Sequence, residues 1–120
     1  MKKMSMETEE ELRWIKDYML LTVLLDVLER DIKVMGDIHL KMSGIYIQML
    51  NQFQDNVSSD MAELRSKMRN RGIRIYDQRR TKERLEADFL CRGYHRQWSM
   101  FWGLIKSEVE QKLLSYLKLN

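Results

Sequence analysis

Residues 14–35 read WIKDYMLLTVLLDVLERDIKVM, and this stretch decides the fold. Its apolar residues recur at alternating steps of four and three, which is the 3.5-residue period of a coiled-coil seam. The members of this seam are Trp14, Tyr18, Leu21, Leu25, Leu28, Ile32 and Met35. A second apolar stripe beside it consists of Ile15, Met19, Val23 and Val27. The sequence therefore predicts a long helix that is apolar around more of its circumference than one neighbouring helix would cover.

The residues on either side of this stretch predict both ends of the helix and a second helix after it. Thr8 and Glu11 have the capping-box spacing, in which each side chain accepts a hydrogen bond from the other's backbone. Gly36 is suited to end the helix in a left-handed cap, and Asp37 to cap the next helix at once. We expect a second helix to run back along the first and to end near Gly72. Its apolar stripe is Ile38, Met42, Ile45, Met49, Phe53, Val57, Met61, Leu64 and Met68.

Residues 73–92 change to a period of two, which is typical of half-buried strands. The alternating apolar positions are Ile73, Ile75, Leu85, Ala87, Phe89 and Cys91. A β-hairpin turning near Arg80 to Glu83 is favoured, although this turn contains no Gly, Asn or Pro. The alternative is a helix over residues 81–90 that is capped by Thr81.

The C-terminal residues return to helical spacing. One apolar stripe is formed by Trp98, Trp102, Ile105, Val109, Leu113 and Tyr116. The predicted fold class is mainly α: three long helices in a bundle, the last from about Trp98 to Leu119. A short basic β-hairpin or irregular segment around residues 73–92 precedes that last helix. Residues 1–120 are expected to form a single domain, because a chain of this length buries enough surface for one core.

The composition excludes several classes of protein. Apolar residues make up 44% of the chain and charged residues 32%, which is too apolar for a disordered protein. The single cysteine, Cys91, cannot form an intramolecular disulfide, and no secretory leader is recognisable, so a cytoplasmic location is expected. The longest apolar run, Tyr18 to Leu28, is too short for a membrane-spanning helix, which needs about 20 residues.

Charge is distributed unevenly along the chain. Residues 1–64 contain seven Lys and Arg against twelve Asp and Glu, whereas residues 65–96 contain eleven against four. This basic block is compatible with nucleic-acid binding, because guanidinium groups bind phosphates and aromatic rings stack on bases. The candidate phosphate contacts are Arg69, Arg71, Arg74, Arg79, Arg80, Lys82, Arg84, Arg92 and Arg96, and the candidate stacking residues are Tyr76 and Tyr94.

Other interpretations of the basic block remain open. The block could be a solvated surface that pairs with its own acids, or it could dock on the acidic N-terminal half of a neighbouring subunit. An anionic membrane surface is a third option, but the basic amphipathic helix that this would require is missing. Asp26 interrupts the apolar run of the first helix, and we expect it either to face a gap in the seam or to pair with a basic side chain, rather than to be a functional carboxylate.

Nothing in the sequence predicts catalysis, a metal site or a cofactor. Cys91 and His95 have a spacing seen in metal sites, but only two ligands are visible there, and the pair fails if Cys91 lies on a strand. No nucleophile, base and orienting group form a recognisable set, and the glycines are scattered singly. We therefore expect no enzyme and infer no small-molecule substrate.

Two function classes remain. The first is a non-enzymatic helical interaction protein, an adaptor or small regulatory subunit, which is oligomeric because the apolar circumference of the first helix exceeds what one chain covers. A homodimer through the seam from Trp14 to Met35 is the structural hypothesis. The alternative is a small nucleic-acid-binding protein that uses the basic block from Arg65 to Arg96.

Overall fold

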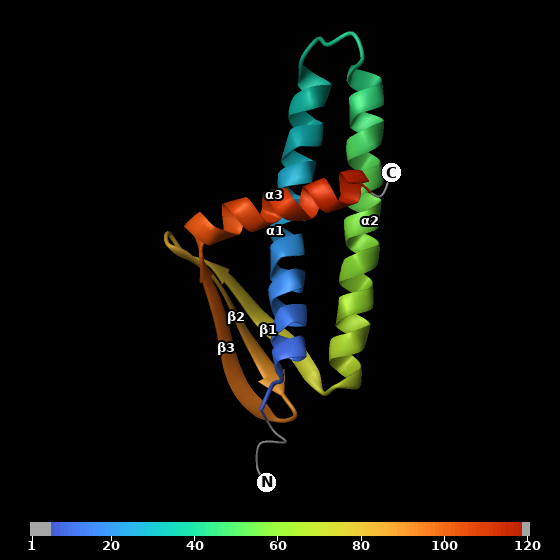
Figure 1. Cartoon of the computed structure of the whole chain (residues 1–120). Coiled ribbons are helices and arrows are strands. Elements are labelled where there is room, and N and C mark those ends of the chain that lie inside the picture. The colour runs from blue at the N-terminus through green and yellow to red at the C-terminus, as the bar shows by residue number, and fades with distance from the viewer. Residues whose placement is uncertain (1–5, 119–120) are drawn as a thin grey trace.

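Two antiparallel helices, a three-stranded sheet and a final helix succeed one another along the chain (Figure 1). The computed structural model describes residues 6–118. The elements are α1 (Glu9–Asp37), α2 (Ser43–Asn70), β1 (Ile73–Arg80), β2 (Arg84–Cys91), β3 (Tyr94–Phe101) and α3 (Trp102–Lys118). This arrangement confirms the predicted mainly α fold, with three helices and a β segment before the last one.

Helix α1 begins as its capping box predicts. The Thr8 hydroxyl accepts a hydrogen bond from the Glu11 backbone N–H at 3.0 Å, and the Thr8 N–H donates to Glu11 Oε1 at 3.0 Å. The predicted left-handed cap at Gly36 is wrong, because α1 runs on to Asp37. Asp37 therefore cannot cap α2, which starts at Ser43 after a five-residue connection.

The end of α2 lies where Gly72 predicts it. Gly72 has a φ of +74°, a left-handed conformation that side chains disfavour. A Cβ atom at this position would lie 2.9 Å from Cγ of Arg92, so the two turns approach each other closely. Glycine is thus required here both by backbone conformation and by space, and it lets the chain reverse directly from α2 into β1.

The predicted hairpin of β1 and β2 is confirmed, with its turn at residues 81–83. Thr81 takes the role that Gly or Asn usually plays in such turns. Its hydroxyl oxygen accepts hydrogen bonds from the backbone N–H of Glu83 at 3.3 Å and of Arg84 at 2.9 Å. A side chain that satisfies two backbone donors stabilises the turn without a special backbone conformation.

A third strand replaces the expected start of the last helix. β3 pairs with β2 without interruption from Cys91↔Tyr94 to Arg84↔Phe101, and α3 starts at Trp102 instead of Trp98. Arg92 (φ 49°) and Gly93 (φ 92°) form the tight turn between the two strands. Trp98 lies opposite Ala87 on the covered face of the sheet, so its four-residue spacing from Trp102 was not a helical signal.

The core lies between this sheet and the lower half of the helical hairpin. Phe89 and Leu85 of β2 are buried together with Ile15 and Met19 of α1. α3 crosses α1 and α2 near the middle of their length and buries Ile105, Val109 and Tyr116 (Figure 1). The far end of the hairpin projects beyond both, and the radius of gyration, 16.5 Å, exceeds the value of about 14 Å expected for a compact chain of this length.

Candidate functional site

The far end of the α1–α2 hairpin is apolar and uncovered. We call residues 34–49 the hairpin tip. Seven large apolar side chains there are each between 41% and 55% exposed, namely Val34, Ile38, Leu40, Met42, Ile45, Tyr46 and Met49. Over residues 34–54 the only Asp, Glu, Lys or Arg are Asp37 and Lys41. An apolar patch of this kind marks an interaction surface more often than it marks a free surface.

Part of the predicted inward stripe of α2 is therefore wrong. Ile38, Met42, Ile45 and Met49 are exposed, and Ile38 and Met42 precede the helix altogether. From Phe53 onward the stripe is buried or partly buried as predicted. The physical reason is length: the sheet and α3 cover the hairpin only as far as Leu28 and Phe53, and the helices continue beyond.

The seam proposed as an oligomer interface lies mostly within the chain's own core. Tyr18, Leu21 and Leu28 are buried, and Trp14 and Leu25 are partly buried against the core. The last two members of the seam are partly buried, Ile32 just before the hairpin tip and Met35 within it. The homodimer itself stays a prediction, but the uncovered apolar surface lies further along the helices than the seam predicted.

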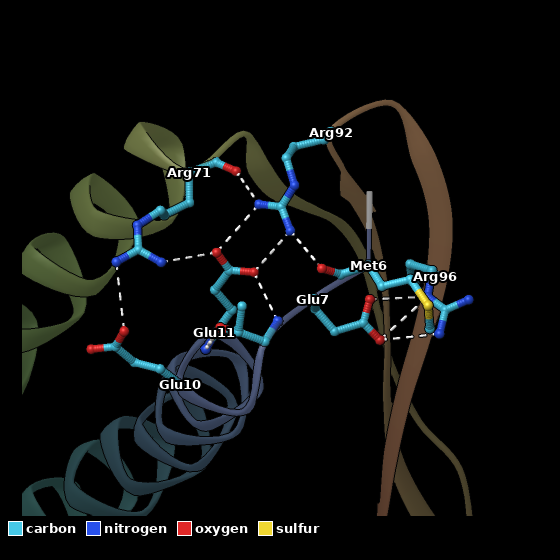
Figure 2. Close-up of polar contacts among 8 residues, drawn as sticks. Met6, Glu7, Glu10, Glu11, Arg71, Arg92 and Arg96 are labelled. Atoms are coloured by element: carbon cyan, nitrogen blue, oxygen red, sulfur yellow. Dashed lines mark hydrogen bonds and ion pairs between the residues drawn. The ribbon is translucent and has the colours of Figure 1, made fainter. Parts of the chain in front are cut away.

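At the opposite end of the molecule, a buried carboxylate joins three segments (Figure 2). The Glu11 side chain is only 2% exposed. Its Oε2 accepts a hydrogen bond from Nη1 of Arg71 at 3.0 Å, and its Oε1 accepts one from Nη2 of Arg92 at 3.0 Å. We call Thr8, Glu11, Arg71 and Arg92 the Glu11 cluster. It fastens the start of α1 to the end of α2 and to the turn between β2 and β3.

Further contacts surround the Glu11 cluster. Arg92 donates to the backbone carbonyls of Arg71 and Met6, each at 2.7 Å, and Arg96 binds Glu7 at 3.0 Å (Figure 2). Burial alone would raise the pKa of Glu11, but hydrogen bonds from Arg92, the Thr8 backbone and Arg71 outweigh it. The pKa of Glu11 therefore lies below its ordinary value. The carboxylate is ionised and structural.

A second set of ion pairs lies on the outer face of the sheet. Arg79 binds Asp88 at 2.8 Å, Glu86 at 3.1 Å and Asp77 at 2.5 Å. These hydrogen bonds raise the pKa of Arg79, and the guanidinium in turn lowers the pKa of Asp88. Three carboxylates around one arginine leave that arginine no charge to offer a phosphate.

Asp26 pairs with a basic side chain, which is one of the two arrangements expected for it. Its Oδ2 lies 2.6 Å from Nη2 of Arg80. Glu7, Glu10 and Glu11 likewise pair with arginines of the basic block. The acidic N-terminal half and the basic block therefore meet within one chain.

Five of the nine candidate phosphate contacts are thus neutralised inside the chain, namely Arg71, Arg79, Arg80, Arg92 and Arg96. The guanidinium of Arg84 lies 4.5 Å from the centre of the Phe101 ring and donates to the Ser99 hydroxyl. Arg69, Arg74 and Lys82 form no ion pair with any residue that the structure describes. Among the candidate contacts, these cations and Arg84 are available to an external anion without breaking an ion pair.

The two candidate stacking residues, Tyr76 and Tyr94, have different surroundings. The Tyr76 hydroxyl is hydrogen-bonded to Nδ1 of His95 at 2.9 Å, and the two rings meet edge to face. Tyr94 is 59% exposed at the turn between β2 and β3. The sheet therefore does not bring the two tyrosines together into one stacking platform.

The spacing of Cys91 and His95 does not make a metal pair. Cys91 is buried at the end of β2, and burial raises the pKa of its thiol. The two residues lie on neighbouring strands, so the helical spacing that suggested a metal pair does not apply. No three His, Cys, Asp or Glu side chains within residues 6–118 are grouped so that they could hold a metal ion.

Comparison with known proteins identifies the family. A protein-family model described as YhjD protein matches residues 6–120. The chain belongs to the YhjD family. No curated protein and no solved structure matches it.

For this member of the YhjD family, the sequence contains a signal for the hairpin tip that helical periodicity alone does not reveal. The long apolar stripes of α1 and α2 exceed the length of the elements available to cover them, since the C-terminal helix α3 has 17 residues against 29 and 28. Residues 34–54 also contain few charges. Together these two features mark an apolar end that the sheet and α3, as the structure describes them, do not cover. None of the helices described here is long and apolar enough to cross a membrane.

Proposed function

We propose that this YhjD-family chain is a non-enzymatic interaction protein that forms a homodimer through its hairpin tips. The observation that carries the proposal is the group of seven half-exposed large apolar side chains on residues 34–49. Such side chains amount to on the order of 600 Å² of apolar surface, the upper end of what monomeric proteins leave uncovered. A standard interface buries about 800 Å² per partner, so these side chains could supply much of the apolar part of such an interface.

A second copy of the chain is the partner that fits this surface. Two copies related by a two-fold axis can place their hairpin tips side by side. The two helix pairs then form a four-helix arrangement in which the apolar side chains of each tip cover those of the other. The two formal charges of the tip are opposite, Asp37 and Lys41. In a two-fold arrangement with Asp37 of one chain next to Lys41 of the other, the contact that buries the apolar side chains would also pair these charges.

Sedimentation velocity from about 1 to 200 μM tests the proposal. Wild type is expected to shift from monomer to dimer, and Ile45→Lys combined with Met49→Lys is expected to weaken dimerisation at least about a hundredfold, because two buried charges would face apolar neighbours. The matched control is Leu104→Lys, which changes a 58% exposed apolar residue on α3, away from the tip. A compact monomer at 200 μM, or equal loss in the Leu104→Lys control, would show the proposal to be wrong.

The nucleic-acid alternative has less support than the basic block suggested. Most of its arginines are held by carboxylates of the same chain, and breaking those ion pairs would offset the gain from phosphate contacts. A nucleic-acid complex would therefore depend on Arg69, Arg74, Lys82 and Arg84, and the logarithm of its affinity should fall with a shallow slope of about four or less in log salt. A cytoplasmic location fits the interaction proposal, because Cys91 is a buried free thiol.

A further inference from the structure

A cleft of about 220 Å³ lies where α2 turns into β1 and faces α1. Its rim carries three arginines from two different elements: Arg65 and Arg69 of α2 and Arg74 of β1. None of the residues that line it is acidic. We call it the arginine cleft. It differs from the other arginine-rich places of the molecule, at Glu11 and at Arg79, where carboxylates neutralise the positive charge.

The arginines of the cleft are only partly engaged. Arg65 donates a hydrogen bond from Nη1 to the Tyr18 hydroxyl at 3.0 Å, and its guanidinium lies 5.8 Å from the centre of the Tyr18 ring. This contact holds Arg65 in place, and no carboxylate of residues 6–118 forms an ion pair with it. Arg69 and Arg74 form no ion pair with any residue in the described part of the chain. Three positive charges around a concave surface favour the binding of an anion. The side chains of Arg69 and Arg74 can turn toward such an anion without breaking an ion pair.

The base of the arginine cleft is apolar. Met68 and Ile73 line it and are each 3% exposed, and Ile75 lies beside them. Contact with these apolar side chains does not stabilise a hydrated inorganic ion, but it does stabilise the carbon skeleton of an organic ligand. The volume is below the range of about 300 to 1,000 Å³ of drug-sized ligand sites, so the skeleton is small.

We propose that the arginine cleft binds a small organic phosphate monoester. Its phosphate, with nearly two negative charges at neutral pH, lies between Arg69 and Arg74, with Arg65 behind them. Its carbon part lies on Met68 and Ile73. The proposal is independent of the hairpin tip, which lies at the other end of α2.

Titration calorimetry on the full chain at low salt, with phenyl phosphate and inorganic phosphate as probes, tests the assignment. Phenyl phosphate is expected to bind, and inorganic phosphate to bind at least about fivefold more weakly, because it cannot use the apolar base. Arg69→Gln combined with Arg74→Gln is expected to weaken phenyl phosphate binding at least about tenfold, since each removes a charge-assisted hydrogen bond. Both side chains are exposed, so the variant should keep its fold, which circular dichroism checks.

The matched control is Lys82→Gln, which removes another cation that lacks an ion pair among the described residues but lies in the β1–β2 turn. It should leave binding unchanged. The proposal is overturned if phenyl phosphate does not bind at millimolar concentration, if inorganic phosphate binds equally well, or if Lys82→Gln weakens binding as much as the double variant. A single-stranded oligonucleotide that binds more tightly than phenyl phosphate and depends on Arg69 and Arg74 would assign the cleft to nucleic acid instead and overturn the small-ester proposal.

Discussion

The two ends of the α1–α2 hairpin have the same helical periodicity but opposite surroundings. At the base, the sheet buries one face of α1, and Glu11 binds Arg71 and Arg92 (Figure 2). At the hairpin tip, residues 34–49 have neither a covering element nor an ion pair among the described residues (Figure 1). The comparison shows that apolar periodicity predicts a helix, whereas burial depends on how much of the chain is left to cover it.

The largest effect is expected at the centre of the covered end. Phe89 is completely buried between the sheet and α1. Phe89→Ala should lower the free energy of unfolding by about 4 kcal/mol, because it removes a large apolar side chain and leaves a cavity. Urea unfolding followed by circular dichroism measures this. A loss below about 1 kcal/mol would mean that the sheet does not form the core with α1.

The Glu11 cluster is expected to come second. Glu11→Gln keeps the shape of the side chain but leaves Arg71 and Arg92 without a buried negative partner. We expect a loss of about 2 to 3 kcal/mol, less than for a fully buried pair because both arginines are partly exposed. The control is Glu10→Gln, whose side chain is 54% exposed and lies 3.5 Å from Arg71, and it should cost less than about 0.5 kcal/mol. Equal costs for the two variants would contradict a special role for Glu11.

The lowered pKa of Glu11 predicts that the stability of the fold depends on pH. The pKa of Glu11 is lower in the folded chain than its ordinary value of 4.5. The stabilisation of the fold by the ionised Glu11 carboxylate is therefore fully present above pH 4.5. It is lost as the pH falls through the lower pKa of the folded state, since the proton then binds more readily to the unfolded chain. The urea midpoint of wild type should thus fall below about pH 4.5 more steeply than that of Glu11→Gln. Parallel pH profiles would count against the cluster.

The smallest effects on folding are expected at the hairpin tip. Val34→Ala and Ile45→Ala should each change the free energy of unfolding by less than about 0.5 kcal/mol at low micromolar concentration, because both side chains are already half exposed. Amide hydrogens of residues 34–49 should also exchange faster than those of residues 15–28 under these conditions. Tip substitutions that cost as much as Phe89→Ala would remove the distinction between the two ends.

The helices were predictable because their signals are local. Thr8 and Glu11 lie three residues apart, and the stripes of α1 and α2 repeat over many turns, so neither needs knowledge of the rest of the fold. The hairpin of β1 and β2 was predictable from alternation alone. Its turn was harder, because the hydrogen bonds of Thr81 to Glu83 and Arg84 replace the usual glycine or asparagine.

The features that the sequence did not predict, strand β3 and the specific charge pairs, were missed for equally specific reasons. Strand β3 escaped prediction because, of its inward positions, only Trp98 and Met100 pack on the core as apolar side chains, and the spacing of Trp98 and Trp102 resembles a helix. Pairing of the basic block with acids of the same chain was one of the open alternatives, but the specific partners could not be predicted because they depend on which segments meet in space. No sequence pattern links Glu11 to Arg92, so the basic block resembled a phosphate-binding surface. In the structure, Arg71, Arg80, Arg92 and Arg96 pair with acids of the N-terminal half, and Arg79 pairs with acids of the sheet.

The contacts of Glu11 also constrain the order in which the chain assembles. They join residues 60 and 81 positions apart, and the pair of Glu7 and Arg96 joins residues 89 positions apart. Helices α1 and α2 can associate as soon as both have been synthesised, but their acidic start has no counterion from the strands until the turn at Arg92 exists. A nascent chain that ends before this turn therefore presents an apolar helix pair in which Arg71 can already bind Glu11, whereas Arg92 and Arg96 are still missing from the base.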